Sequence, residues 1–289
     1  MKKSLSLSFL VLCLVLSLCS CSVFSGEETS SQNSSVENKI TVVSYDDGVG
    51  IRGIAAELFG FAKTEGDKIV DEIFNGATIK KSTTEIVSEV ENNKNAVALV
   101  PFSAVKGDKV KKLSVNGVSP EIANIKSGSY KYSHNLYATT KGKADGGAQD
   151  FINFILSEDG QAIILEKGYI SKSNTGKFTS QKPEGKTQIY VTDSLKEITE
   201  TLKETYGKLN NKLNIEITVM NDKSALGELK DNKNLAIITK KLTEAEKESY
   251  SENLFGQEGI AVIVNAQNSM TDIKSEKVKS IFKGETENW

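Results

Sequence analysis

The chain has 289 residues, and its 36 Lys and Arg against 38 Asp and Glu give a formal net charge of −2. Charges of both signs are interspersed without a basic stripe, which argues against a nucleic-acid partner. The three cysteines (Cys13, Cys19 and Cys21) lie in the first 21 residues, and there is one histidine, His134. These counts speak against cysteine catalysis, a Ser-His-Asp triad and a Cys- or His-ligated metal, so we expect neither an enzyme nor a cofactor.

The first segment has the order of a bacterial export signal. Lys2 and Lys3 precede an apolar run over residues 5–18, which is too short for a membrane-spanning helix. The run ends at Leu18-Cys19-Ser20-Cys21, which resembles a lipobox with Cys21 as the lipidated residue. We expect a lipoprotein signal peptide at 1–20, a disordered tether at 21–39 and a lipid anchor that holds the protein on the outer side of the cell membrane. An ordinary secretory signal is the alternative.

Short β-branched segments alternate with amphipathic ones in the rest of the chain, which is typical of α/β lobes with mainly parallel or mixed sheets. Ser82 and Glu85 are spaced as a capping box, and Gly160 is a candidate break within a helix. In chain order the pattern predicts a strand at 40–44, a helix at 51–64, a helix from 82, a strand at 96–100, a helix at 149–167, a surface linker at 171–187, a strand at 188–191, a helix at 195–209, a strand at 215–220, a helix from 225, and strands at 235–239 and 259–264 before a helix at 275–282.

The same strand–loop–helix unit occurs once in each half of the chain. The strand at 40–44 leads into the loop Tyr45–Gly50, and the strand at 188–191 leads into Thr192-Asp193-Ser194. In an open α/β lobe, ligands bind at the carboxyl ends of strands, where helix N-termini offer free N–H groups to an oxyanion. Two facing lobes with one such loop each would form a cleft for a small anion. Taken alone, each loop is better explained as a plain helix cap or a tight turn, and the matching pair brings the two interpretations level.

Segments throughout residues 40–289 resemble, in shifted order, those of one family. The ending Ile281-Phe-Lys-Gly-Glu-Thr-Glu-Asn-Trp289 is similar to an internal segment of that family, and the strand and glycine loop that should follow it lie at 40–52. The matching segments, in family order, are 191–195, 222–227, 234–240, 259–265, 281–289, 40–52, 95–100, 115–120, 125–130 and 151–170. Together they resemble the phosphate-binding substrate-binding proteins of ABC transporters.

This resemblance implies a periplasmic-binding-protein-like α/β fold, with two lobes around a hinged cleft and a circularly permuted chain. Lobe A would comprise 40–110 and 262–289, and lobe B 111–261, with the linker at 171–187 joining the old chain ends. A clipped longer gene would mimic the same order. The resemblance also implies a monomer that binds phosphate or a similar small inorganic anion and serves an ABC permease in the membrane.

The resemblance places the ligand-binding residues in two loops and two shorter segments. The departures from the family pattern are Tyr45 in place of an arginine, Val49 and Ile51 in place of hydroxyl residues, and Asn234 in place of an acid. Lost charge-assisted hydrogen bonds weaken the binding of a dianion, so a sensor, an adaptor or a binder of another ligand is the alternative function. The candidate ligand residues are Tyr45, Gly48, Val49, Gly50, Ile51, Arg52, Thr192, Asp193, Ser194, Leu195, Ser224 and Asn234.

Overall fold

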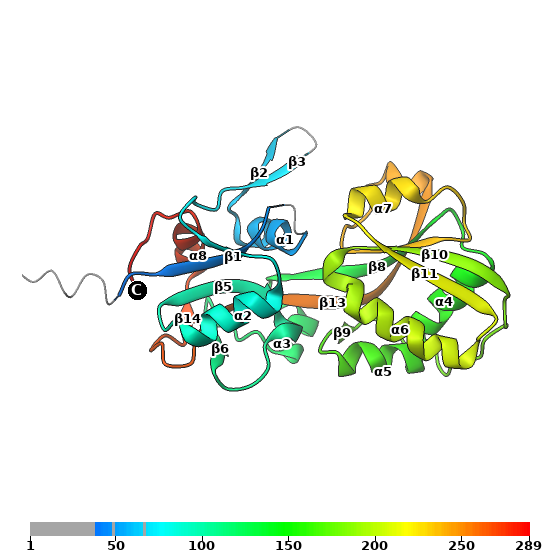
Figure 1. The fold of residues 1–289 in the computed structure, drawn as a ribbon, viewed down its shortest axis with the longest axis horizontal. Coiled ribbons are helices and arrows are strands. Elements are labelled where there is room, and N and C mark those ends of the chain that lie inside the picture. Colours follow the sequence, from blue (N-terminus) through cyan, green and yellow to red (C-terminus); the bar gives the residue numbers. More distant parts are fainter. Residues whose placement is uncertain (1–37, 48–49, 66–67) are drawn as a thin grey trace, which may run out of the picture. The chain divides into compact units, whose positions relative to one another are not determined.

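The computed structural model describes residues 38–47, 50–65 and 68–289. The predicted signal peptide, Cys21 and most of the predicted tether therefore lie outside the described residues. A 10-stranded mixed sheet, in the order β11-β10-β12-β8-β13-β5-β1-β4, organises the described part, with β6 and β9 pairing with β13 (Figure 1). Two long antiparallel strands, β8 (Ser133–Lys141) and β13 (Tyr250–Asn265), run along the middle of the sheet.

One end of the sheet, together with its helices, forms lobe A. Its strands β1, β4 and β5 are parallel, and α1, α2 and α8 pack against them (Figure 1). The elements of this part are β1 (Thr41–Tyr45), α1 (Gly50–Phe59), β2 (Ala62–Glu65), β3 (Lys68–Asp71), β4 (Thr78–Lys80), α2 (Thr83–Asn92), β5 (Ala96–Pro101), the 3-10 turn η1 (Phe102–Ala104), β6 (Val110–Lys112), β7 (Ser114–Val115), α3 (Ile122–Ser127), β14 (Asp272–Ile273) and α8 (Ser275–Phe282).

The other end of the sheet forms lobe B, in which β10, β11 and β12 are parallel. The strand β12 shows how its two faces are covered: Leu235 and Ile237 belong to a core with α4, α5 and α6, whereas Ala236 and Ile238 pack with α7. The elements of this part are α4 (Gly146–Leu156), α5 (Glu158–Glu166), β9 (Ile170–Ser171), β10 (Gly185–Val191), η2 (Asp193–Leu195), α6 (Lys196–Leu209), β11 (Leu213–Val219), α7 (Asp222–Glu228), β12 (Leu235–Ile238) and η3 (Glu246–Glu248).

The hydrophobic cores favour a revised division of the chain. The lobe A core also includes Leu113, Val115, Ile125 and Tyr130, which the predicted boundary at residue 110 assigned to lobe B. We therefore propose that lobe A extends to about residue 132, where β8 begins, and resumes near residue 260 within β13. The strands β8 and β13 then form the two crossings between the lobes.

The two ends of the described chain lie together in lobe A. Ile40 N donates to Glu287 O at 2.7 Å, and Trp289 N donates to Asn38 O at 3.2 Å. Trp289 also donates from its indole Nε1 to Asn95 O at 3.2 Å. This arrangement is compatible with the circular permutation, which stays a prediction.

Several predicted boundaries are wrong for local reasons. The helix predicted to reach residue 64 ends at Phe59, because Gly60 adopts a left-handed φ of 75° and a β-hairpin follows. The predicted helix at 149–167 divides at Ser157, which caps α5 through its hydroxyl, rather than at Gly160. Gly160 instead lets α5 approach α4, since a Cβ there would lie 2.1 Å from Phe154 O. The predicted capping box is confirmed in part: Ser82 Oγ accepts from Glu85 N, whereas the Glu85 carboxylate accepts from Lys81 N.

Candidate functional site

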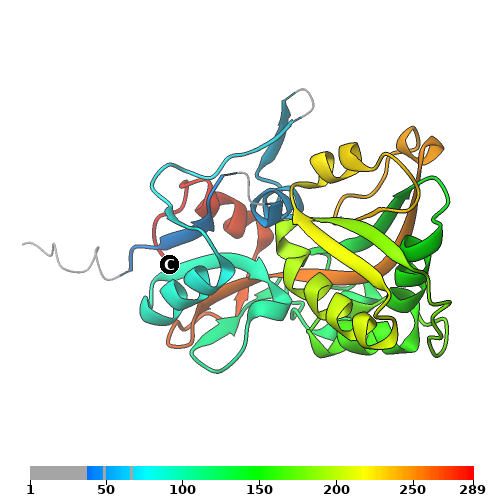
Figure 2. The ribbon, with the colours of Figure 1, turned by 45° about the vertical axis from the view of Figure 1, so that its right-hand side comes forward.

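The elements that flank the two predicted anion loops meet between the lobes. The strand β1 ends at Tyr45 and leads to α1, and β10 ends at Val191 and leads to η2 and α6. The elements α1 and η2 contact each other, although they belong to different lobes (Figure 2). Gly50 is the first residue of α1 and is exposed, whereas Gly48 and Val49 lie outside the described residues. The carboxyl ends of the two strands therefore border one cleft, as such loops do in open α/β folds.

On the lobe A side, the polar groups of Tyr45 and Arg52 bond within the lobe. The Tyr45 hydroxyl, buried at the end of β1, hydrogen-bonds Thr83 Oγ1 at 2.9 Å. Arg52 donates from Nε and Nη2 to the two carboxylate oxygens of Asp71, at 2.6 and 2.8 Å, and from Nη1 to Tyr45 O at 2.8 Å. Ile51 is buried in the core. The arginine that the sequence offered as a possible anion partner is thus occupied by Asp71.

The Arg52–Asp71 pair is largely shielded, with side chains 14% and 10% exposed. Burial alone would raise the pKa of Asp71, but the hydrogen bonds from Arg52 and Ile73 N and the guanidinium charge hold it below its ordinary value. The bond to Asp71 raises the pKa of Arg52. Both groups therefore stay charged, and the β3 carboxylate fixes the guanidinium beside the first turn of α1.

On the lobe B side, the loop donors divide into occupied and free ones. Thr192 is buried, and its hydroxyl donates to Asp222 Oδ1. Two residues later, the buried Ser194 Oγ has no hydrogen-bond partner within the described part of the chain. Asp193 is exposed, and Leu195 is buried in the lobe B core. Ser194 is thus the hydroxyl of this loop that remains available to a ligand.

The remaining predicted residues have other positions. Ser224 is exposed in the first turn of α7, where its N–H donates to Asn221 Oδ1 at 2.9 Å. Asn234 precedes β12, whereas ligands are expected at the carboxyl end of that strand. Its Oδ1 accepts from Gln188 N at 2.8 Å and its Nδ2 donates to Asp231 at 3.1 Å. Asn234 therefore holds neighbouring backbone together, and the structure does not bring it to the loop residues.

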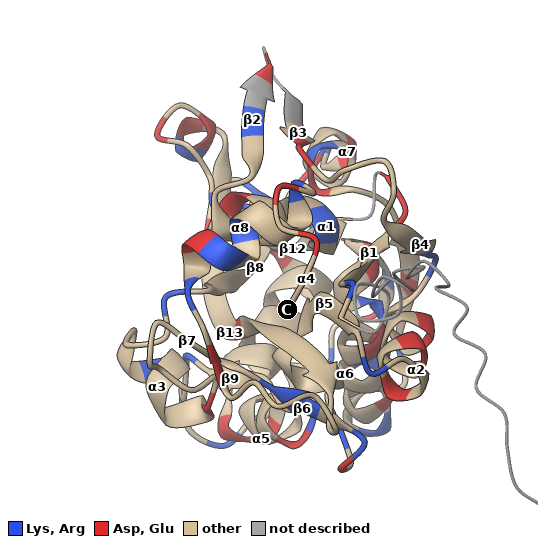
Figure 3. Ribbon diagram, turned by 90° about the vertical axis from the view of Figure 1, so that its left-hand side faces the viewer, with Lys and Arg blue, Asp and Glu red and all other residues tan. Residues whose placement is uncertain are grey.

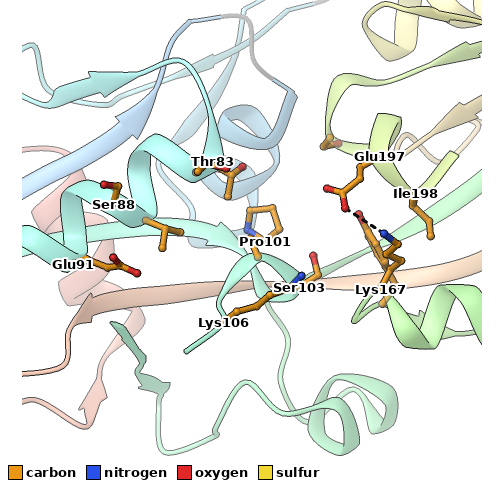
Figure 4. A pocket seen from close by; sticks show the side chains of 14 residues that line it. Thr83, Ser88, Glu91, Pro101, Ser103, Lys106, Lys167, Glu197 and Ile198 are labelled. Atoms are coloured by element: carbon orange, nitrogen blue, oxygen red, sulfur yellow. Dashed lines mark hydrogen bonds and ion pairs between the residues drawn. The ribbon is translucent and has the colours of Figure 1, made fainter. Parts of the chain in front are cut away.

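A cavity of about 470 Å³ lies between the lobes beside Ser194 (Figure 4). Lys167 and Glu197 point toward one another at its lobe B wall, with Nζ and Oε1 3.4 Å apart. This space is much larger than a tetrahedral oxyanion, so such a ligand would need the lobes to close around it. The lining residues are Thr83, Thr84, Val87, Ser88, Glu91, Pro101, Ser103, Ala104, Lys106, Lys167, Tyr169, Ser194, Glu197 and Ile198.

A buried polar group adjoins the cavity at the crossing strands, and the sequence analysis missed it. Glu258 on β13 is paired in register with His134 on β8, and Ser103, a cavity-lining residue, donates its hydroxyl to Glu258 Oε1. His134 Nε2 and Glu258 Oε2 are 3.9 Å apart, which is too long for a hydrogen bond. The visible signal was an acid beside an uninterrupted apolar run, at Glu258-Gly-Ile-Ala-Val-Ile-Val264.

Burial determines the charge of both members of this pair. Removal from water raises the pKa of Glu258 to about 8, despite the opposing effect of the Ser103 bond. The same effect lowers the pKa of His134 to about 4. Both side chains are therefore neutral at pH 7, and the crossing strands carry no net charge at this point.

Within residues 38–47, 50–65 and 68–289, no helix is long and apolar enough to cross a membrane. The same part of the chain holds no group of three or more His, Cys, Asp or Glu placed to bind a metal ion. In Figure 3, basic and acidic positions both occur along the ribbon of lobe A.

Two lobes joined by two strands, with facing carboxyl-end loops, define a solute-binding protein. The model of the PBP superfamily domain matches residues 21–159 and 176–289. The phosphate-binding protein PstS 2 of Streptococcus agalactiae is 32% identical, with 100% of this chain and 98% of that protein covered. The chain belongs to this family of ABC-transporter solute-binding proteins, which confirms the predicted family and the prediction that it is not an enzyme.

A solved structure confirms the predicted two-lobed fold. The crystal structure of a phosphate-binding protein of a phosphate ABC transporter from Streptococcus pneumoniae matches with a TM-score of 0.80 and 28% identity, covering 87% of this chain and 98% of that chain. The phosphate-binding protein PstS of Bacillus subtilis is 34% identical over 137 residues, 46% of this chain and 42% of that protein. A half-length match is what a difference in segment order would produce, and the circular permutation stays a prediction.

Proposed function

We propose that this protein captures phosphate, or a similar small oxyanion, in the cleft between its lobes and delivers it to an ABC permease as an extracytoplasmic monomer. The observation that carries the proposal is the contact between α1 and η2, the elements that follow β1 and β10 in different lobes. The names of the S. agalactiae and S. pneumoniae relatives support phosphate as the ligand. We further propose that Cys21 is lipidated and tethers the protein to the outer face of the membrane.

The two predicted loops offer neutral donors rather than a free arginine. Ser194 Oγ has no partner among the described residues, and the N-termini of α1 and of η2 follow the strands β1 and β10, a position at which helix N-termini favour a negatively charged ligand. Closure of the lobes about β8 and β13 would bring both loops onto one oxyanion and exclude water. The affinity should be modest rather than tight, because these donors form fewer charge-assisted hydrogen bonds than a bidentate arginine would.

Calorimetric titration of residues 21–289 with phosphate and with sulfate tests this proposal. We expect phosphate binding, and the substitution Ser194→Ala should weaken it about fivefold, as the loss of one hydrogen bond does. The exposed lobe B variant Ser249→Ala is the matched control and should bind as the wild type does. Absence of binding at millimolar phosphate would rule out the phosphate proposal.

The alternative function is a sensor, an adaptor or a binder of a different ligand. It is favoured by the commitment of Arg52 to Asp71 and by a cavity larger than phosphate. A thermal-shift screen of anions, sugars and peptides distinguishes the two. Stabilisation by a non-anionic ligand, without stabilisation by phosphate, would establish the alternative.

The lipid anchor has its own test. Cells that express the full chain with metabolically labelled fatty acid should incorporate the label into it, and Cys21→Ala should abolish incorporation. Label retained by Cys21→Ala would place the lipid elsewhere, and an unlabelled wild-type chain would indicate an ordinary secretory signal.

A further inference from the structure

The carboxylate of Asp222 lies where the strands β10 and β12 of lobe B end, and it collects hydrogen bonds from both. Its Oδ1 accepts from the hydroxyl of Thr192, which follows β10. Its Oδ2 accepts from Thr239 Oγ1 at 2.8 Å, Thr239 N at 3.2 Å and Lys240 N at 2.7 Å, all just after β12. Two hydroxyls and two backbone N–H groups from two neighbouring strand ends thus converge on one negatively charged group.

This set of donors has the chemistry of an oxyanion cradle. Neutral hydroxyl and N–H donors at the carboxyl ends of parallel strands are the groups that a bound oxyanion would use in such a lobe. Here the anion belongs to the chain itself, since Asp222 is the first residue of α7. None of the four donors is a cation, so these contacts leave the negative charge of Asp222 unneutralised.

The hydrogen bonds are unevenly divided between the two oxygens of Asp222. Oδ2 accepts from three donors and Oδ1 from one, against about two lone-pair positions on each oxygen. Oδ2 is therefore saturated, and Oδ1 keeps one acceptor position. Beside the cradle, the hydroxyl of Ser194 is buried and unpartnered within the described residues, although it is two positions from Thr192. Asp222 therefore satisfies one hydroxyl of the loop and leaves the next one free.

We propose that Asp222 is an internal competitor that occupies the oxyanion position of lobe B and sets the affinity for the free ligand. This rests on the proposed function, because it takes the cleft to be an oxyanion site. Binding exchanges one anion for another: the ligand takes over the bonds from Thr192, Thr239 and Lys240, and the Asp222 side chain rotates into solvent. The number of hydrogen bonds is conserved, so the exchange favours ligands with more negative charge than a carboxylate.

Titrations of the variants with phosphate and with sulfate test the proposal. Asp222→Ala empties the cradle and should bind at least one of these anions about tenfold more tightly than the wild type. Glu228→Ala removes an equal charge from the exposed end of the same helix and should change affinity by less than about twofold. Unchanged or weaker binding of both anions by a folded Asp222→Ala would overturn the proposal. Asp222 would then have a structural role or contact the ligand directly.

Amide NMR spectra of the wild type supply a second readout, which does not depend on the folding of a variant. Saturating phosphate should shift the Thr239 and Lys240 amide resonances, because both N–H groups change their acceptor. Phosphate binding that leaves both resonances unshifted would overturn the proposal that Asp222 competes with the ligand. The two proposals can also be separated. If the wild type does not bind phosphate but Asp222→Ala binds phosphate or sulfate, the proposed function is wrong and the proposal that Asp222 competes with the ligand is supported.

Discussion

The two loops that border the cleft keep their polar groups occupied in different ways. In lobe A, Arg52 pairs with Asp71, so a positive and a negative charge neutralise each other in a shielded position. In lobe B, Asp222 is held by Thr192, Thr239 and Lys240 through neutral donors, so its charge persists. The lobe A pair is therefore a closed unit, whereas the lobe B arrangement leaves one anion that another anion can replace.

This difference predicts which lobe rearranges when a ligand arrives. Withdrawing Arg52 toward the cleft would leave the carboxylate of Asp71, 10% exposed, without its counter-charge, which costs several kcal/mol. Replacing Asp222 by a ligand oxyanion leaves no donor unsatisfied and releases a side chain that is already partly exposed. Ligand exchange in lobe B is thus the less costly route, and lobe A acts as the rigid wall.

The largest expected effect comes from breaking the lobe A pair. Asp71→Asn and Arg52→Gln should each lower the free energy of unfolding by about 2–4 kcal/mol, and the double variant should lose little more, because both remove the same interaction. Denaturant titrations measure these values. Glu287→Gln, which breaks an exposed pair with Lys39, should change stability by less than about 1 kcal/mol. Arg52→Gln that kept full stability but lost ligand affinity would show that Arg52 serves the cleft instead.

The next largest effect is a pH dependence of stability, which comes from Glu258 and His134 on the crossing strands. The folded chain keeps the Glu258 proton up to about pH 8, whereas the unfolded chain releases it above its ordinary pKa of 4.5. The contribution of Glu258 is therefore complete below pH 4.5 and is lost as the pH rises toward 8. His134 acts oppositely: its pKa falls from 6.5 to about 4, so its contribution is complete above pH 6.5 and is lost on acidification.

These two contributions oppose each other between pH 4.5 and 6.5, and Glu258 acts alone above that range. From pH 6.5 to 8, the wild type should lose up to about 2 kcal/mol of stability relative to Glu258→Gln. Thermal unfolding of both proteins over this range measures the difference, and Glu228→Gln on the exposed end of α7 is the control. Parallel curves for wild type and Glu258→Gln would mean that Glu258 is ionised in the folded state.

Much of the fold could be predicted because local apolar spacing determines it. The parallel strands β1, β5 and β12 appear in the sequence as short apolar runs, and the buried side chains of α6 recur at helical spacing. The strand β8 and the first part of β13 escaped this method, whereas the last part of β13 contains the strand predicted at 259–264. β8 and the first part of β13, from Tyr250, mix polar and apolar residues, and their identity as strands comes from pairing with each other, more than 100 residues apart.

The candidate site was predicted in outline and missed in its bonding. The positions of the two loops follow from their place after strands, which the sequence shows. Which donor each loop presents depends on partners from elsewhere, as Asp71 reaches Arg52 from β3 and Asp222 reaches Thr192 from α7. Asn234 shows the same dependence on partners: it precedes β12, and its amide bonds Gln188 N and Asp231 rather than reaching the two loops.

The smallest expected effect tests whether Tyr45 belongs to the lobe A wall or to the ligand. Burial raises the pKa of Tyr45 far above its ordinary range, although the Thr83 bond opposes this, so the hydroxyl stays neutral. Tyr45→Phe and Thr83→Val each remove the same 2.9 Å hydrogen bond and should each cost about 1 kcal/mol of unfolding free energy. The double variant should lose less unfolding free energy than the two single variants combined, because the same hydrogen bond is lost in each of the three proteins. Phosphate affinity should stay within about twofold for Tyr45→Phe, because its hydroxyl is already bonded inside lobe A. A large loss of affinity with unchanged stability would instead place this hydroxyl on the ligand and remove the contrast between a closed lobe A and an exchangeable lobe B.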